Sequence, residues 1–484
     1  MAAADELFLG VDIGTGGVRM VAVNQQGEVA AVGRASIPAE AGQATLHEQH
    51  PEAWWNGLTA AAAALRAELS AAGRTLASIR ALAVDGTSGT VACLDREGRP
   101  LRPALMYNDG RSAAEAVTLN ETAGSFGDEI GYRFASSFSL AKILWIRNWE
   151  PAVFSRTHYF AHQADFINWR LTGVPGVSDY SNALKTGYDL VDECWPAWMG
   201  SYAGVERRLP EIVPPARVIG EVGREAARAT GLAAGTVVVS GATDGTAGAL
   251  AAGLKRPGDY NTSLGTTLIF KALSDRLIKS RDGLLYSHKL PGGRWLPGAA
   301  SNTGGRWVAE WFPGADPAAL DAAAADLLPL DDITYPLIGT GERFPFRKES
   351  ARGFGPGAGS DRERFAAGLQ GTALFERHCY ATLDAVAGST AGEVYTTGGG
   401  SRSDIWVQCR ADASGRVYNR PCHPEAAFGA AILAAAGTVF ADLQGAVDAM
   451  VRIERSFVPD SAVADCYDDL YNRFVRELAR RGYA

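Results

Sequence analysis

Residues 7–23 read LFLGVDIGTGGVRMVAV, two runs rich in β-forming residues joined by a turn of glycine and threonine. This pattern predicts a β-hairpin with a polar tip, and Asn24–Gly27 form the turn into a third strand. Residues 260–270, YNTSLGTTLIF, repeat the design. Because Gly265 follows Gly14 by about half of the chain, we interpret the sequence as two similar halves, each opening with the same kind of hairpin.

The chain has 484 residues and is too long for one hydrophobic core, since single cores stop growing near roughly 250–300 residues. The Gly/Pro/basic segment Gly253–Gly258 predicts a boundary, with an N-terminal domain of residues 1–252 and a C-terminal domain of residues 253–484. Strand-like runs alternate with helical patterns, which predicts an α/β architecture with helices covering sheets. Helices are expected at Pro51–Leu69, Gln163–Leu171, Ala318–Leu328, Arg364–Ala387 and Ala426–Ala436.

The composition excludes several classes of function. Its 47% hydrophobic and 21% charged residues are ordinary for a soluble protein, and no apolar run approaches the roughly 20 residues that span a bilayer. A net charge of −8 argues against a nucleic-acid surface. The six cysteines show no paired spacing, and His47 and His50 lack the HExxH spacing, so neither disulfides nor zinc are indicated. The N-terminus lacks a signal-peptide pattern, and we expect a cytoplasmic protein.

The turn Asp12–Arg19, DIGTGGVR, carries groups that suit a magnesium and phosphate site. An acid at the end of a strand can bind Mg²⁺, and the turn offers backbone N–H groups and the Thr15 hydroxyl to phosphate oxygens. An ordinary hairpin turn explains the same residues, because Asp, Gly and Thr are common in turns. The motif becomes specific only in combination with others.

Asp244 lies in Ser240–Thr246, SGATDGT, directly after the apolar strand Thr236–Val239. Its small neighbours would let a substrate approach closely, and α/β proteins place catalytic groups at such strand ends. The alternative is a structural aspartate that caps the helix predicted at Gly245–Ala252.

Glycine clusters in the second half are candidates for nucleotide binding. Ser263–Thr267, SLGTT, offers a second phosphate turn, and Thr396–Asp412 places a triple glycine before a helix that begins near Ser403. Bare glycine backbone and helix N-termini favour phosphate contact. Ser301–Arg306, SNTGGR, is a weaker example. The first two clusters match neither the P-loop nor the dinucleotide-binding motif.

Polar residues at two strand ends of the first half are candidates for sugar contacts. They lie in Asp85–Thr90, DGTSGT, and in Tyr107–Arg111, YNDGR. Hydroxyl and carboxylate groups can pair with the several hydroxyls of a sugar, although ordinary turn chemistry explains the same residues. The candidates are Asp85, Thr87, Ser88, Asn108 and Asp109.

Taken together, these motifs resemble the FGGY carbohydrate kinase family of the actin-like ATPase superfamily, over nearly the whole chain from about Leu7 to Gly437. The resemblance implies an α/β fold of two actin-like ATPase (ribonuclease H-like) domains that face each other across a catalytic cleft, which closes when sugar binds. It rests on DIGTGGVR, HPEAWW (50–55), YNDGR for the usual W-N-D-x-R, SLAKILW (139–145), DFINWRLTG (165–173), SDYSNA (178–183), GATDGT, SLGTT and TTGGGSRSDIWVQCRAD (396–412).

The resemblance also implies roles for single residues, with ATP and Mg²⁺ as cofactors. Asp244 would be the general base on the sugar hydroxyl and, with Asp12, a ligand of Mg²⁺. Thr15 and Arg19 would lie near the transferred phosphate. Lys142 and Trp145 match the family signature but are better explained by packing. The residues implied to bind ATP are Gly14, Thr15, Gly16, Arg19, Gly265, Thr266, Gly304, Gly399, Gly400 and Ser403.

A small-molecule sugar is the expected partner, with no nucleic acid or membrane. VDGTSG resembles the D-x-T arrangement of ribulose kinases, whereas YNDGR resembles the W-N-D-G-R of xylulose kinases, with Tyr107 in place of Trp. The G-Q-x-H-G run of xylulose kinases is missing. We expect D-ribulose as substrate, with D-xylulose or another polyol as the alternative, and a non-catalytic sugar or ATP sensor of the same fold as the alternative of another class. Homodimers are common in the family, and no feature of the sequence decides the oligomeric state.

Overall fold

The structure is a computed structural model that describes residues 6–38, 47–280, 283–357, 359–388 and 392–483. The chain divides into two compact units. Unit 1 comprises Met1–Gly253, His288–Arg294 and His423–Val451, and unit 2 comprises Leu254–Ser287, Trp295–Cys422 and Arg452–Ala484. Among the described residues, no helix has both the length and the apolar character needed to cross a membrane.

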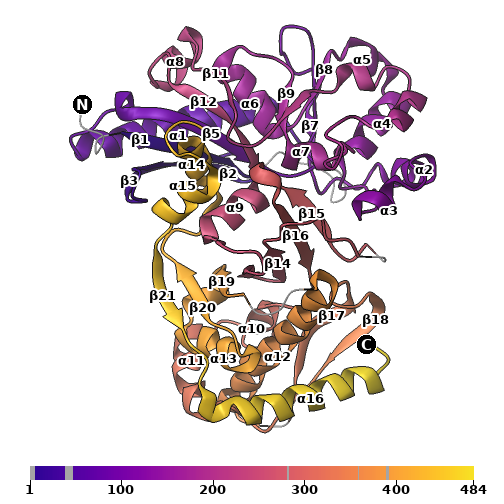
Figure 1. The fold of residues 1–484 in the computed structure, drawn as a ribbon, viewed down its shortest axis with the longest axis vertical. Coiled ribbons are helices and arrows are strands. Elements are labelled where there is room, and N and C mark those ends of the chain that lie inside the picture. Colours follow the sequence, from indigo (N-terminus) through magenta and orange to yellow (C-terminus); the bar gives the residue numbers. More distant parts are fainter. Residues whose placement is uncertain (1–5, 39–46, 281–282, 358, 389–391, 484) are drawn as a thin grey trace. The chain divides into compact units, whose positions relative to one another are not determined.

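Unit 1 is built on a six-stranded sheet with the order β11-β12-β5-β1-β2-β3 (Figure 1). The strands are β1 (Leu7–Ile13), β2 (Gly17–Val23), β3 (Val29–Ser36), β5 (Ile79–Gly86), β11 (Val218–Glu221) and β12 (Val237–Thr243). The predicted hairpin is confirmed, because β1 pairs antiparallel with β2, which pairs antiparallel with β3. On its other side β1 is parallel to β5, and β5 is parallel to β12.

Helices cover both faces of this sheet. On one face, alternate residues of β1 share an apolar core with Trp54 of α1 (Pro51–Ala71). Gly10 alternates with those residues and faces the other way, toward α14 (Ala426–Ala436), which contacts β1 and β5. A Cβ at Gly10 would lie 1.6 Å from the Ala427 carbonyl oxygen. Only glycine therefore allows α14 to approach the sheet this closely.

The division into units differs from the expected boundary at residue 252. Unit 1 ends its first segment at Gly253, but 288–294 and 423–451 also belong to it. Figure 1 shows the yellow helices α14 and α15 (Leu443–Met450) beside the indigo strands of unit 1. The reason is physical: α14 is apolar on every side and is stable only when it is buried. Its second neighbour is α9 (Asp244–Ala252), where a Cβ at Gly429 would lie 1.8 Å from the Ala247 carbonyl oxygen.

The rest of unit 1 surrounds this sheet. The short strand pairs are β4 (Glu48–Gln49) with β7 (Ala104–Leu105), β6 (Ala92–Leu94) with β8 (Tyr159–Ala161), and β9 (Val177–Asp179) with β10 (Glu211–Val213). Its further helices are α2 (Ala113–Thr122), α3 (Phe126–Ile130), α4 (Ser139–Trp149), α5 (Pro151–Arg156), α6 (Gln163–Thr172), α7 (Tyr180–Leu184) and α8 (Arg224–Thr230). The helices predicted from Pro51 and from Gln163 are confirmed as α1 and α6.

The second sheet repeats the topology of the first, with the order β15-β16-β14-β13-β19-β20-β21. β13 is antiparallel to β14 and parallel to β19, as β1 is to β2 and β5. β16 is antiparallel to β14, as β3 is to β2. β20 is parallel to β19, as β12 is to β5. This confirms the interpretation of two similar halves. The strands are β13 (Tyr260–Leu264), β14 (Leu268–Ala272), β15 (Tyr286–Lys289), β16 (Trp295–Ala300), β19 (Val394–Thr397), β20 (Tyr418–Pro421) and β21 (Ile453–Phe457).

Helices of unit 2 form its core with the second sheet. The helix predicted at Arg364–Ala387 is confirmed within α12, whereas the one predicted at Ala318–Leu328 ends at Ala324 and continues as a 3-10 turn. A separate hairpin joins β17 (Tyr335–Glu342) and β18 (Lys348–Phe354). The helices are α10 (Arg306–Trp311), α11 (Pro317–Ala324), α12 (Asp361–Ala387), α13 (Asp404–Ser414) and α16 (Ala464–Arg480).

Candidate active site

A row of charged side chains crosses the sheet of unit 1. In the strand register, Arg34 of β3 stands opposite Arg19 of β2. Arg19 stands opposite Asp12 of β1, and Asp12 stands opposite Asp85 of β5. Directly paired residues project to the same face of a sheet, so all four side chains share the face on which α14 packs. Both aspartates lie near the carboxyl ends of parallel strands, where α/β proteins bind ligands.

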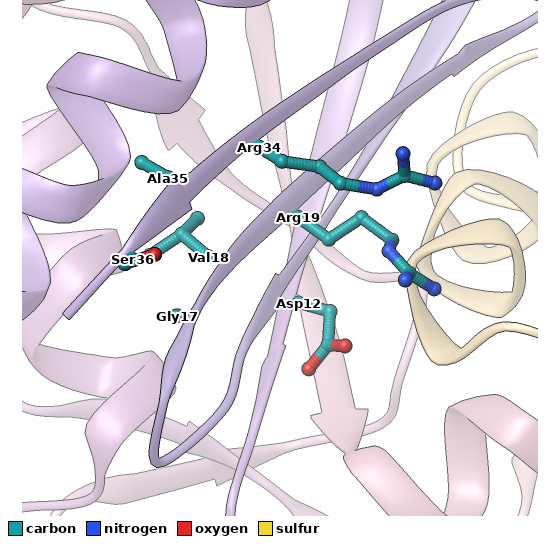
Figure 2. A pocket seen from close by; sticks show the side chains of 7 residues that line it. All are labelled: Asp12, Gly17, Val18, Arg19, Arg34, Ala35 and Ser36. Atoms are coloured by element: carbon teal, nitrogen blue, oxygen red, sulfur yellow. The ribbon is translucent and has the colours of Figure 1, made fainter.

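An open pocket of about 470 Å³ lies over one end of this row. Figure 2 shows the side chains of Arg19 and Arg34 running side by side, with the Asp12 carboxylate next to Arg19. Arg19 also lies 3.9 Å from a carboxylate oxygen of Glu425, and the two side chains are 36% and 39% exposed, so the pair adds little stability. The pocket is lined by Asp12, Gly17, Val18, Arg19, Arg34, Ala35 and Ser36.

Asp85 is the most strongly perturbed acid of the row. It is fully buried, and neither carboxylate oxygen has a donor in hydrogen-bond geometry among the described residues. Burial raises the pKa of Asp85 well above its usual range, and the negative charges of Asp12 and Asp244 raise it further. Burial also raises the pKa of Asp12, although Asp85 and Arg19 oppose the rise. The Asp12 and Asp85 carboxyls can share one proton, but when both are ionised Asp85 lacks a donor. Buried polar groups are normally satisfied, so this arrangement indicates a ligand.

Asp244 follows β12 as the first residue of α9 and is exposed. Thr243, not Asp244, occupies the N-cap position. The Asp244 carboxylate accepts a hydrogen bond of 2.6 Å from the Gly245 N–H. The capping alternative therefore does not account for Asp244, and the fold holds this residue near Asp85, whose pKa it raises.

The first hairpin turn is held by Gln49, which the sequence patterns did not single out, with the help of Trp54 from the HPEAWW motif. Gln49 of β4 is buried and donates from its amide to the Thr15 carbonyl oxygen at 2.7 Å. Trp54 in turn donates to the Gln49 side-chain oxygen at 2.9 Å. Thr15 and Gly16 themselves stay exposed, and a Cβ at Gly16 would meet nothing within 4 Å. The turn is therefore open to solvent, and the packing of the protein would tolerate a side chain in place of Gly16.

The predicted sugar residues of the 85–90 loop form a buried network with α6. Gln163 accepts from the backbone N–H of Thr87 at 3.0 Å and from its hydroxyl at 2.8 Å. The Thr87 hydroxyl also lies 2.7 Å from that of Thr90. The Ser88 hydroxyl and the Gln163 side-chain nitrogen are buried and have no hydrogen-bond partner among the described residues. Gln163 is a second residue that sequence reasoning missed.

The second predicted sugar segment adjoins this loop, since the Tyr107 N–H donates to the Thr90 hydroxyl at 3.2 Å. Asp109 is buried, and its carboxylate accepts two hydrogen bonds of 2.8 Å from the Arg111 guanidinium. Although burial acts to raise the pKa of Asp109, these bonds and the charge of Arg111 hold it below its usual range. Asn108, which is exposed, is thus the more accessible member of the pair.

In unit 2, the SLGTT and SNTGGR turns pack against each other. The Gly305 N–H donates to the Gly265 carbonyl oxygen at 2.8 Å. A Cβ at Gly304 would lie 2.4 Å from the Cα of Thr267, so this close packing requires glycine. Gly265 and Thr266 are exposed, whereas Gly304 is buried. The structure therefore brings the three residues together and leaves Gly265 and Thr266 accessible to a ligand.

The triple-glycine turn follows β19, directly beside β13. Gly398 has a φ of +84°, and Gly400 packs on the Leu264 side chain. Gly399 is exposed, and a Cβ there would meet nothing within 4 Å. Ser403 is the N-cap of α13, accepting from the Trp406 N–H at 2.8 Å, and its hydroxyl donates to Asp321. The predicted ATP residues of unit 2 thus lie in the segments that follow β13, β16 and β19.

Glu342 is a third residue that the sequence did not reveal. It is buried at the end of β17 and accepts from the Thr303 hydroxyl at 2.7 Å and from the Tyr335 hydroxyl at 2.9 Å. It also accepts from the Asn302 N–H at 2.5 Å. A single glutamate therefore fixes the backbone that leads into Gly304.

Acidic groups do not form a metal cage by themselves. In the described ranges, no three His, Cys, Asp or Glu residues are grouped so that they could hold a metal ion. The repeated sheet topology and the glycine turns after β1, β13 and β19 define a protein with two actin-like ATPase domains.

Comparison with known proteins agrees with this class. The models of the FGGY family of carbohydrate kinases match at residues 7–251 for the N-terminal domain and 260–438 for the C-terminal domain. The xylulose kinase of Escherichia coli K12 is 29% identical over 428 residues, 85% of each chain. That of Klebsiella pneumoniae is 30% identical over 426 residues, 84% of this chain and 85% of the relative. The crystal structure of xylulose kinase from Rhodospirillum rubrum matches with a TM-score of 0.87 and 30% identity, covering 98% and 99% of the two chains.

The chain belongs to the FGGY family of carbohydrate kinases. It is a phosphotransferase that uses ATP and has an alcohol group of a small sugar as its acceptor, as the resemblance implied.

Proposed function

We propose that the protein phosphorylates a ketopentose with ATP and that Asp244 is the base that activates the accepting hydroxyl. The observation that carries the proposal is the group of acids at the carboxyl ends of β1, β5 and β12, in which the buried Asp85 lacks a donor. A sugar supplies several O–H donors, which are what carboxylates accept. Asp85, Thr87, Ser88 and Asn108 would contact the sugar, and Asp109 would act through its pair with Arg111.

Asp244 suits the role of base because its carboxylate is exposed at the start of α9, where the helix dipole stabilises negative charge. In the proposed reaction it accepts the proton of the sugar hydroxyl while the hydroxyl oxygen attacks the γ-phosphorus. ADP leaves with the electron pair of the broken P–O bond. The catalytic contribution is mainly positioning and charge neutralisation, as in other phosphoryl transfers.

Magnesium fits the acids of unit 1. Mg²⁺ keeps several waters and is usually bound by one or two carboxylates together with substrate phosphates, so the lack of a three-residue cage in the described ranges agrees with it. Asp12 and Asp244 would hold the ion. When bound, it neutralises phosphate charge. Burial raises the pKa of both Asp12 and Asp85, and a nearby cation would lower both again.

The nucleotide would be bound by the glycine turns of unit 2 and by the first hairpin. The transferred phosphate would be bound by the turn Gly14, Thr15 and Gly16 and by Arg19 of β2. Gly399 and Gly400 would approach ATP near the α13 N-terminus, where backbone N–H groups favour anions. Gly265 and Thr266 would contribute the neighbouring turn. Gly304 and Ser403 would act by shaping these turns, in view of their packing and hydrogen bonds.

Two neighbouring glycines allow a matched test of this assignment. Gly399→Ala should raise the KM for ATP about tenfold, the cost of weakening one phosphate contact, and leave the Tm unchanged because the added methyl group has room. Gly398→Ala should lower the Tm, because its φ of +84° disfavours a side chain and a Cβ would lie 2.6 Å from the Leu264 carbonyl oxygen. Steady-state kinetics and thermal unfolding of both variants measure this. An unchanged KM for ATP in Gly399→Ala would remove Gly399 from the site.

The identity of the ketopentose rests on two opposed observations. The loop 85–90 has Asp85 and Thr87 in the arrangement resembling ribulose kinases and no histidine, which supports D-ribulose. The named relatives are xylulose kinases, which supports D-xylulose. The two sugars differ only in the configuration at C3. We propose D-ribulose first and D-xylulose second.

A coupled ADP-release assay with Mg²⁺-ATP tests the proposal on D-ribulose, D-xylulose, their L-isomers, glycerol, pentitols and hexoses. Turnover at least tenfold faster on one ketopentose than on the other classes is expected. Best turnover on a hexose or on glycerol would contradict the ketopentose assignment. ATP and sugar binding without ADP release would favour a sensor of the same fold.

A further inference from the structure

Lys185 lies at the end of α7 and holds the 85–90 loop. Its ammonium donates to the Ser88 carbonyl oxygen at 3.0 Å. An ammonium has three N–H donors. Among the described residues, the Ser88 carbonyl oxygen is the one hydrogen-bond acceptor of the Lys185 ammonium. The side chain is only partly buried. The Lys185 ammonium also lies 5.9 Å from the centroid of the Phe138 ring. At least one of its N–H donors is therefore left to meet a ligand or solvent.

The surroundings of Lys185 are those of the candidate sugar site. Its ammonium and the Asp244 carboxylate interact electrostatically. The Ser88 hydroxyl, in the residue whose carbonyl it binds, is buried without a hydrogen-bond partner in the described ranges, and so are the Asp85 oxygens. A Cβ at Gly89 would lie 3.0 Å from the Lys185 Cδ, which shows how closely the lysine stem lies along the loop. Lys185 therefore holds a loop in which Asp85 and Ser88 carry side-chain oxygens without such a partner, and it interacts with the acid proposed as base.

We propose that Lys185 donates a hydrogen bond to the carbonyl oxygen of an open-chain ketopentose and so makes the enzyme prefer ketoses to the corresponding pentitols; this rests on the proposed function. A carbonyl oxygen only accepts hydrogen bonds, and an ammonium only donates them. When ionised, the carboxylates of Asp85 and Asp244 only accept, so in that state they select hydroxyls and cannot bind the carbonyl. Lys185 supplies the donor that this set of acids lacks.

Lys142 offers a matched control in the same unit. It is a buried lysine whose ammonium also holds one backbone carbonyl, that of Ser136, at 2.7 Å. Burial lowers the pKa of both lysines, to about 7 for Lys142 and about 8 for Lys185. Lys142 is fully buried on α4, in keeping with the packing role expected for it. Both substitutions therefore remove an ammonium that fixes a loop, but only the Lys185 side chain is partly exposed.

The experiment compares kcat/KM for a ketopentose and for its pentitol in the wild type and in Lys185→Met, Lys185→Gln and Lys142→Met. We expect Lys185→Met to lower the ketose-to-pentitol ratio by about 10- to 100-fold, the size of a hydrogen bond to a charged donor. Its KM for ATP should stay within about twofold, a change that is small on the free-energy scale. Lys185→Gln keeps a neutral N–H donor and should recover part of the ratio. Lys142→Met should lower the Tm and leave the ratio unchanged.

An unchanged ratio in Lys185→Met with an active wild type overturns the inference and leaves the proposed function standing. A wild type without turnover on any ketopentose overturns the proposed function instead. Should Lys142→Met fail to fold, the pair Lys185→Met and Lys185→Gln decides the question, because both remove the charge and only one keeps a donor. Equal ratios in these two variants, both as in the wild type, again count against Lys185.

Discussion

Asp244→Ala is expected to lower kcat by about 10²- to 10⁴-fold, the usual contribution of a positioned base. The dissociation constant for ATP should stay nearly unchanged, because most of the residues proposed to bind ATP are in the glycine turns of unit 2. Asp244 accepts a hydrogen bond from the Gly245 N–H and is not the helix N-cap, so its removal should not unfold α9. ADP release under saturating sugar and calorimetric titration with ATP measure the two quantities.

Asp361→Ala is the control for this variant. Asp361 is likewise the first residue of a helix, α12, and its N-cap is the preceding Ser360. Both variants lose a negative charge at a helix N-terminus, which costs roughly 0.3–1 kcal/mol. The control should keep full turnover. If Asp244→Ala retained kcat within tenfold of the wild type, another group would have to be the base.

Arg410→Met is expected to destabilise unit 2 by about 3–5 kcal/mol, because it leaves a buried carboxylate without its cation. Arg410 of α13 and Glu376 of α12 are both fully buried, with contacts of 2.5 and 2.9 Å between guanidinium nitrogens and carboxylate oxygens. Arg410 also donates to the Thr396 hydroxyl of β19 at 2.8 Å, and Glu376 accepts from the Tyr380 hydroxyl at 2.6 Å. The pair thus fixes the strand and the helix that flank the triple-glycine turn.

The double variant Arg410→Met with Glu376→Met tests whether the loss of stability comes from the unpaired charge of Glu376. Replacing both partners by apolar side chains of similar volume removes the unpaired charge and is often neutral, so the double variant should be more stable than Arg410→Met alone. Urea unfolding followed by tryptophan fluorescence measures this, with separate transitions allowed for the two units. A double variant less stable than the single one would contradict the account.

Local signals in the sequence were enough to predict the two hairpins. The turns GTG at 14–16 and GTT at 265–267 consist of residues that favour turns, and the runs on both sides are rich in β-forming residues. The repeat of the hairpin was therefore enough to reveal the duplication, which the parallel pairing of β1 with β5 and of β13 with β19 confirms. The long helices α1 and α12 were likewise predictable from local patterns in the sequence.

The return of α14 to unit 1 could not be predicted in this way. The alanine-rich run 426–436 predicts a buried helix, but nothing in it names a partner. That partner is set by two glycines far apart in the sequence, Gly10 and Gly429, whose missing side chains let the backbones approach. Tertiary contact of this kind leaves no local pattern.

The residues that support the site were missed for a similar reason. Gln49, Gln163, Lys185 and Glu342 are ordinary polar residues whose place in the sequence gives no sign of their contacts. Each becomes informative only when the fold places it against a loop, as Gln49 is against Thr15 and Glu342 against Thr303. The acids themselves were found because they follow strands and lie in motifs with glycine.

The most direct test of the central claim is phosphorus NMR of the products that the wild type forms from ATP and D-ribulose or D-xylulose with Mg²⁺. The account predicts a pentulose phosphate and ADP in equal amounts, both formed at least about 100-fold more slowly by Asp244→Ala. Inorganic phosphate and ADP without sugar phosphate, or no consumption of ATP with any ketopentose, would contradict it.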